Sequence, residues 1–190
     1  MKKAYIFYVD NFRRIYMKKA LFLAIMLLTG CSDYYAGARS DVYITTTAGL
    51  GQKIGEVSFQ DTSDGLRVTV DLQNIPQGEH GFHIHENPDC GALADAHGQM
   101  QPALKARGHY DPYKTGHHLG PNQKQGHQGD LPYLTADQNG QVKTSFYMPN
   151  LQVKDIKNRS LIVHAGGDNY RDTPLPLGGG GARIACGVIE

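Results

Sequence analysis

Alternation of apolar and polar residues is the feature that most constrains the fold of this chain. Residues 55–59 and 66–72 place apolar side chains at every second position. Alternate side chains of a β-strand share one face, so each segment would bury one face and expose the other. Further segments rich in β-forming residues lie at 42–47, 81–86, 141–148, 160–165 and 182–189. With 23 Gly and no Trp, the composition agrees with an all-β sandwich or barrel rich in turns.

A long Gly- and Pro-rich region, residues 87–134, interrupts the predicted strands. A structureless loop of this length is uncommon in a compact domain unless something holds it in place. Because the region contains Cys90, several His and Asp130, we expect a metal and a disulfide to pin it. A second, shorter excursion runs from residue 166 to residue 181.

Two of the nine His form an H-x-H pair inside a predicted strand. His83 and His85 lie in segment 81–86, where positions i and i+2 of a strand face the same way. Two imidazoles side by side suit copper or zinc. The pair alone is only moderately specific, because exposed His pairs also arise by chance.

The long loop and a later strand supply the other ligand candidates. The loop candidates are three imidazoles and one carboxylate, a complete tetrahedral set for zinc: His109, His118, His127 and Asp130. His164 ends the apolar run 161–164, where a His is usually a satisfied core residue. Here it would be the last ligand of the site that His83 and His85 begin.

The motifs around these residues together resemble those of the bacterial copper/zinc superoxide dismutases. The matching segments stand in the family's order within about residues 41–190: 81–86, 108–112, 118–121, 126–131 and 178–189. The resemblance implies an all-β fold, an eight-stranded Greek-key β-barrel with a long metal-binding loop. It also implies copper and zinc as cofactors, and dismutation of superoxide to dioxygen and hydrogen peroxide as the activity.

The resemblance assigns a role to each candidate residue. His109 would bridge the two metals and pass a proton to the product, and Arg183 would receive the superoxide anion. Asp168 would link ligands of the two metals from behind, and Cys90 and Cys186 would form a disulfide. The implied copper ligands are His83, His85, His109 and His164. The implied zinc ligands are His109, His118, His127 and Asp130.

Three His have no ligand role in this scheme. His80 matches a structural position of the family, and His97 matches nothing of use. His117 is a neighbour that could compete with His118, but the context of residues 118–121 favours His118. Arg183 follows four Gly and an Ala, so we expect its side chain to have little local packing and to matter more for rate than for folding.

The charge of the chain bears on its partners. Removing the six basic residues and one acidic residue of positions 1–30 from totals of 19 and 18 leaves a body of about −4. This argues against nucleic acid as a partner, since phosphate binding needs clustered positive charge. The anionic substrate would need local attraction, and the loops carry five cations that could form a positive rim or be plain solvated charges: Lys105, Arg107, Lys114, Lys124 and Arg171.

The first 30 residues have the pattern of a secretory signal peptide. The apolar run 20–28 has nine residues, too few for a bilayer span of about 20. It follows Lys18 and Lys19 and precedes a small-residue junction. Residues 28–31, LTGC, resemble the bacterial lipobox, which predicts lipid on Cys31; an ordinary signal peptide containing a Cys is the alternative. Translation could begin at Met1 or at Met17, with the same mature protein.

Export agrees with the cysteine count. If Cys31 carries lipid, the pair Cys90 and Cys186 remains, and an oxidising compartment would close it; two buried free thiols are the alternative. We expect a tether at residues 31–40, a domain at 41–190 and a periplasmic location on a membrane. Ser32 after the lipidated Cys favours the outer membrane of a Gram-negative cell.

Two other functions compete with dismutation. One is a lipid-anchored copper- and zinc-binding protein without turnover, which would have no need of Arg183 beside the metal. A metal hydrolase is weaker, since no candidate general base adjoins an open zinc position. Because bacterial relatives occur as monomers and as dimers, a homodimer is compatible with the resemblance.

Overall fold

A computed structural model describes residues 37–190, and this part of the chain is almost entirely β-structure. Its helical elements are α2 (Val153–Ile156) and two 3-10 turns, Leu104–Ala106 and Pro176–Gly179. None of the helices in this part of the chain is long and apolar enough to cross a bilayer. The signal peptide, the alternative start and the lipidation of Cys31 that the sequence predicts lie outside the described residues.

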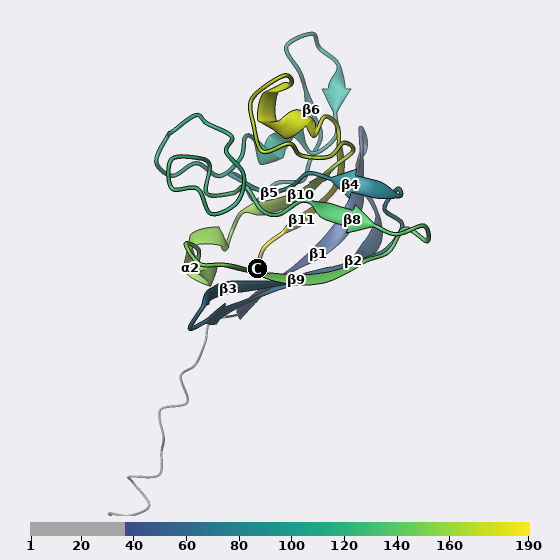
Figure 1. The fold of residues 1–190 in the computed structure, drawn as a ribbon. Helices are drawn as coiled ribbons and strands as arrows, with labels where there is room; N and C mark the ends of the chain where they lie inside the picture. Colours follow the sequence, from purple (N-terminus) through teal and green to yellow (C-terminus); the bar gives the residue numbers. More distant parts are fainter. Residues whose placement is uncertain (1–36) are drawn as a thin grey trace, which may run out of the picture. The chain divides into compact units, whose positions relative to one another are not determined.

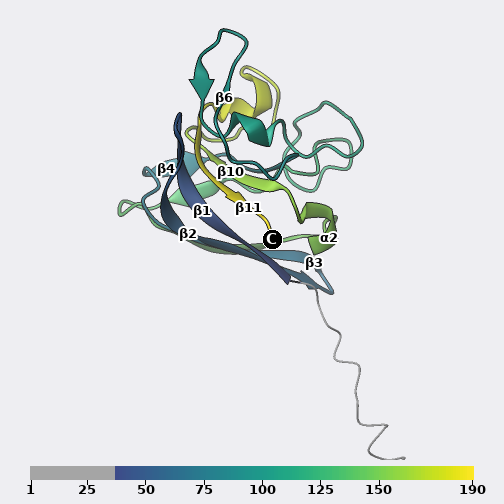
Figure 2. The ribbon, with the colours of Figure 1, turned by 180° about the vertical axis from the view of Figure 1, so that it is seen from behind.

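Seven antiparallel strands form one curled sheet in the order β5-β10-β11-β1-β2-β3-β9 (Figures 1 and 2). Their bounds are β1 (Gly37–Thr46), β2 (Gly49–Thr62), β3 (Gly65–Leu72), β5 (Phe82–His85), β9 (Val142–Met148), β10 (Ser160–His164) and β11 (Arg183–Val188). A separate pair, β4 (Gly78–His80) with β8 (Leu134–Ala136), adjoins the sheet because only Gly81 separates β4 from β5. The predicted all-β fold is confirmed. The curled sheet and the β4-β8 pair together form a half-barrel.

The alternation in the sequence produces the core. In β3 the side chains of Leu66, Val68, Val70 and Leu72 are buried and those between them are exposed. They pack with apolar residues of the other strands into one cluster. Burying each such side chain stabilises the fold by about 1.5–3 kcal/mol.

Strand β1 begins earlier than the sequence predicted. Arg39 pairs with Ser58 and Ser40 with Val57, so the domain boundary predicted at residue 41 falls inside a strand. Ser40 is buried, and residues 37–40 therefore belong to the domain and not to a tether. The segment lacks a local strand pattern, and it becomes extended because β2 (Gly49–Thr62) offers it a pairing edge.

The long loop is held against the barrel at two places. The disulfide between Cys90 and Cys186, with Cα atoms 5.8 Å apart, ties it to β11, as predicted. Backbone hydrogen bonds also fasten it to Ile84 of β5, from Tyr110 N to Ile84 O (2.8 Å) and from Ile84 N to Gly129 O (2.9 Å). Within it lie the hairpin of β6 (Leu93–Ala94) and β7 (Met100–Gln101) and the first 3-10 turn. The long loop and the shorter excursion at residues 166–181 gather on the side of β5 and β10, away from β3 and β9 (Figures 1 and 2).

Candidate metal centre

Strands β5 and β10 position three His side by side. β10 pairs with β5 so that Ile162 lies opposite His83, and His164 ends the same strand. Phe82 and Ile84 alternate with His83 and His85 and are buried in the core. The His face is buried as well, because the long loop covers it.

The first cluster consists of four buried imidazoles whose candidate ligand atoms all lie within 4.8 Å of one another: His83, His85, His109 and His164. Each ring has one buried nitrogen without a hydrogen-bond partner, namely Nδ1 of His83 and Nε2 of the other three. The opposite nitrogen is engaged in all four, and for His109 it is Nδ1, which lies 2.9 Å from Asp130 Oδ1. His83 Nε2 donates to Asp168 (2.7 Å), His85 Nδ1 to the Arg107 carbonyl (2.8 Å) and His164 Nδ1 to the Gly181 carbonyl (3.1 Å).

Such unpartnered buried nitrogens are costly unless a ligand satisfies them. The partners on the other nitrogens fix both the tautomer and the orientation of each ring, as is usual behind metal-bound His. The first cluster therefore has the arrangement of a nitrogen-rich metal site.

The second cluster shares His83 and His109 with the first. Its candidate atoms, again within 4.8 Å of one another, come from His83, His109, His118 and Asp130. His109 Nδ1 lies 2.9 Å from Asp130 Oδ1, and His118 Nδ1 lies 2.9 Å from Asp130 Oδ2. His118 Nδ1 and Asp130 Oδ2 nevertheless make no hydrogen bond with good geometry. Both buried atoms are therefore available to the same ligand.

His127 is not among the four tightest candidates of the second cluster, although the resemblance implied it as a zinc ligand. Its Nδ1 lies 3.5 Å from Asp130 Oδ1, is buried and has no hydrogen-bond partner. His83 stands in that group instead, but its Nε2 is already engaged by Asp168. Three imidazoles and one carboxylate thus surround the second position, counting His127 as a slightly more distant member.

The profile of the family "Copper/zinc superoxide dismutase (SODC)" matches residues 53–189. This chain belongs to the copper/zinc superoxide dismutase family.

Individual relatives agree with the family match. A curated "Superoxide dismutase [Cu-Zn]" of Brucella melitensis is 47% identical over 176 residues, covering 92% of this chain and 100% of the relative. The solved "Cu/Zn superoxide dismutase from Brucella abortus" superposes with a TM-score of 0.79 at 47% identity, over 82% of this chain and 100% of that one. The solved structure of a monomeric copper, zinc superoxide dismutase from Salmonella enterica superposes with a TM-score of 0.72 at 44% identity, over 82% of this chain and 100% of that one.

Copper and zinc, the metals of the family, fit the donor atoms of the two clusters. Four imidazoles suit copper, and a set of imidazoles with one carboxylate suits tetrahedral zinc. The orphaned buried atoms are the deciding observation, because they belong to all seven candidate ligands: His83, His85, His109, His118, His127, Asp130 and His164.

Burial keeps several of these rings neutral. It lowers the pKa of His85 and of His164 well below the usual value, and it lowers the pKa of His109 to about 3. A neutral imidazole is the form that binds a metal. Burial alone would lower the pKa of His118, but the nearby carboxylates of Asp130 (2.9 Å) and of Asp168, which accepts from Nε2, raise the pKa of His118 to about 9. The two carboxylates that favour a proton on the His118 ring would also favour a divalent metal ion bound to that ring.

Asp168 links the two clusters from behind. Its Oδ2 accepts from His83 Nε2 (2.7 Å), and its Oδ1 accepts from His118 Nε2 (2.8 Å). Tyr170 N also donates to Oδ1 (2.8 Å). A Cβ added to Gly178 would lie 1.9 Å from this Oδ1, and Gly178 has a φ of +72°. The sequence had not singled out Gly178, whose contact with Asp168 depends on how the late loop folds back.

Arg183 is anchored more firmly than the sequence predicted. Its Nη1 donates to the Ala103 carbonyl (2.7 Å) and its Nη2 to the Arg107 carbonyl (2.6 Å), one at each end of the first 3-10 turn. It lies opposite His164 across the strand pair, and its positive charge helps to lower the pKa of both His164 and His85. The sequence predicted little local packing for this side chain, and the partners that anchor it lie 80 and 76 residues away in the sequence.

The remaining His lie outside both clusters. His80 is buried between the carbonyls of His164 and Pro76, each 2.7 Å from a ring nitrogen. His97 and His117 are exposed, whereas His118 is buried in the second cluster. The structure therefore places His118, and not its neighbour, beside the other candidates.

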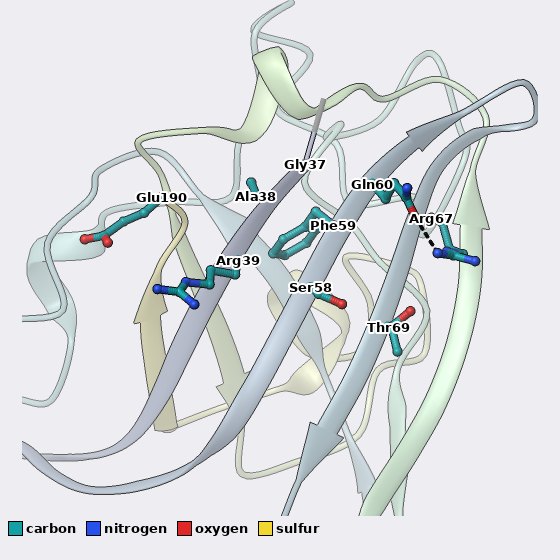
Figure 3. A pocket seen from close by; sticks show the side chains of 9 residues that line it. All are labelled: Gly37, Ala38, Arg39, Ser58, Phe59, Gln60, Arg67, Thr69 and Glu190. Atoms are coloured by element: carbon teal, nitrogen blue, oxygen red, sulfur yellow. Dashed lines mark hydrogen bonds between the residues drawn. The ribbon is translucent and has the colours of Figure 1, made fainter. Parts of the chain in front are cut away.

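A surface pocket of about 480 Å³ lies on the outer face of β1, β2 and β3 (Figure 3). Arg39 and Arg67 lie on either side of its polar floor, and Gln60 forms a hydrogen bond with Arg67. Its lining contains no His or Cys and one acidic residue, Glu190. This pocket lacks the chemistry of a dismutase site, which leaves the two clusters as the functional site of the family.

Proposed function

We propose that this enzyme converts superoxide to dioxygen and hydrogen peroxide at a copper ion in the first cluster, bridged to zinc in the second. The copper ligands would be His83, His85, His109 and His164, and the zinc ligands His109, His118, His127 and Asp130. The observation that carries the proposal is the position of His109 in both clusters, with Nδ1 beside Asp130 and a buried, unpartnered Nε2.

Copper, when bound, supplies the exchange of one electron with each superoxide, which zinc cannot do. The residues of the chain supply proton transfer and anion binding. His109 would hold a proton at Nε2, the buried nitrogen that no protein group engages, and pass it to the product. Arg183 offers a permanent positive charge, and the carbonyls of Ala103 and Arg107 hold its guanidinium in place.

The test compares superoxide decay with purified protein loaded with copper and zinc, with zinc alone, and without metal. We expect rapid decay only with copper present. His164→Gln would remove one candidate copper ligand without changing the second cluster, and should lower copper content while zinc content stays near that of the wild type. Full activity in the zinc-only protein would contradict the proposal.

Metal binding without turnover remains the alternative function. Loaded protein that retains both metals but leaves superoxide unchanged would support it. Arg183 favours catalysis, because a half-buried, anchored cation beside four imidazoles weakens cation binding and serves an anion better.

We further propose that the enzyme is exported to the periplasm and anchored to the outer membrane through a lipid on Cys31. Residues 28–31 and Ser32 support this location, and the closed Cys90–Cys186 disulfide is typical of an oxidising compartment. The intact mass of protein extracted from membranes should show acyl chains on a mature form that begins at Cys31. Cys31→Ser protein should lose them, and an unmodified wild-type terminus in the soluble periplasmic fraction would contradict the anchor.

A further inference from the structure

Arg107 has a backbone conformation that is nearly exclusive to glycine. Its φ is 68° and its ψ is −150°, a region that other residues occupy only at a cost in folding free energy. Ala103, at the other end of the same 3-10 turn, has φ 51° and ψ 21°, which is the more accessible left-handed helical region. A glycine at position 107 would remove the strain.

The strained position lies in contact with the candidate copper site. The Arg107 carbonyl accepts from His85 Nδ1 (2.8 Å) and from Arg183 Nη2 (2.6 Å). Both hydrogen bonds use only the main chain, so a glycine would supply the same carbonyl. The contacts therefore explain why the main chain adopts this conformation, but they do not explain why position 107 carries an arginine instead of a glycine.

The Arg107 side chain is exposed at the edge of this site. Among residues 37–190 none of the ion pairs includes it. Arg183 differs, since burial lowers the pKa of Arg183 and two carbonyls hold its guanidinium. One cation is thus fixed beside the imidazoles, and a second is free in solvent next to it.

We propose that Arg107 is an entrance residue whose exposed guanidinium attracts the small anionic substrate toward Arg183. This inference rests on the proposed function. The mature body carries about −4, which repels an anion at long range. A free cation at the edge of the site raises the local anion concentration and the encounter rate, and its effect falls as salt screens it.

Four variants separate the charge from the backbone strain. Arg107→Gln removes the charge and keeps the strain, Arg107→Lys keeps both, and Arg107→Gly removes both. The matched control is Arg39→Gln, an exposed arginine on the outer face of the sheet (Figure 3). The main chain of Arg39 pairs with Glu190, seven residues beyond Arg183 and thus roughly 20 Å away along an extended chain.

The first measurement uses azide as the anion probe, titrated into copper- and zinc-loaded protein and followed by the visible absorption of copper. Arg107→Gln and Arg107→Gly should bind azide about two- to threefold more weakly at low salt, as one charge at this range predicts. Arg107→Lys and Arg39→Gln should match the wild type. The rate of superoxide decay should fall by a similar factor in the first two variants and depend less steeply on ionic strength.

The second measurement is the melting temperature of the metal-free variants. Arg107→Gly should melt about 2–4 °C above Arg107→Gln, because only glycine relieves the strain. Equal azide affinity and equal salt dependence in Arg107→Gln and the wild type would overturn the inference, as would failure of Arg107→Lys to restore them. A wild type that binds azide but does not consume superoxide would instead refute the proposed function.

Discussion

At the scale of single residues, the site depends on positions that serve both the chemistry and the fold. Arg183 presents a cation to the first cluster and also holds the 3-10 turn through Ala103 and Arg107. Gly178 has no side chain to contribute, yet its missing Cβ leaves the space that Asp168 occupies. Substitutions at such positions should change the chemistry and the fold together.

Arg183→Ala should lower the rate of superoxide decay tenfold or more and also destabilise the protein. Two hydrogen bonds from a charged group are lost, although each acceptor carbonyl keeps a second donor, Ala106 N for Ala103 and His85 Nδ1 for Arg107. With a contribution of about 1.5–3 kcal/mol for such bonds, the metal-free protein should melt several degrees lower. Calorimetry of the metal-free variant beside the wild type checks this, and an unchanged melting temperature would show that the anchoring is not significant.

Gly178→Ala should weaken zinc binding by roughly 10- to 100-fold, the usual effect of losing a partner behind a ligand. The new methyl would clash with Asp168 Oδ1 and approach His118 Nε2 at 2.8 Å. Gly98→Ala is the matched control, since Gly98 has a similar φ of +76° and nothing within 4 Å of the added Cβ. Zinc competition with a chelator distinguishes them; equal zinc affinity in the two variants would contradict a role for Asp168 contacts.

At the scale of elements, the 3-10 turn Leu104–Ala106 connects the disulfide with the site. Ala103 and Ala106 pack with Cys90, Cys186 and Ile162 in a small cluster of their own. The carbonyls on either side of the turn hold Arg183. The disulfide thus supports, through this turn, the position of the guanidinium.

Cys90→Ser should therefore reduce both stability and rate. Opening a link between residues 96 apart costs about 4–5 kcal/mol by chain entropy. Urea unfolding measures the stability, and superoxide decay by fully metal-loaded protein measures the rate. Reduction of the wild-type disulfide should reproduce both effects. A variant that loses stability but keeps the full rate would show that the turn holds Arg183 unaided.

At the scale of the whole molecule, the buried imidazoles couple folding to pH. His85, His109 and His164 have a pKa lowered by burial from 6.5, so the folded state binds fewer protons than the unfolded state below this pH. Their contribution to stability is present above pH 6.5 and is lost as pH falls. His118 acts in the opposite sense, because its pKa is raised to about 9. Its contribution is present below pH 6.5 and is lost as pH rises through about 9.

Metal-free protein should accordingly be most stable near neutral pH and lose stability on both sides. Urea unfolding midpoints between pH 4 and pH 9.5 would measure this, with metal-loaded protein as the comparison. Bound metals should flatten the profile above about pH 5, because metal replaces protons on the same nitrogens. A metal-free profile that is flat from pH 6.5 to pH 4 would contradict the neutral state of the buried imidazoles.

The sequence by itself determined the local features of this protein. Alternation at Leu66–Leu72 predicted which side chains of β3 enter the core, and the spacing of His83 and His85 placed both on one strand face. The ordered motifs indicated the family and its metals. These features could be read because strand periodicity and short-range spacing depend only on neighbours along the chain.

Only the tertiary structure decided what the His face meets. Pairing of β5 with β10, and the loop folded over them, bring His109 between the two clusters and Asp168 behind them. The same folding brings the Arg183 guanidinium to carbonyls 76 and 80 residues away and puts Arg107 in a glycine-like conformation. Such contacts follow from the path of the chain, which long-range strand pairing and the disulfide set and which no local pattern contains.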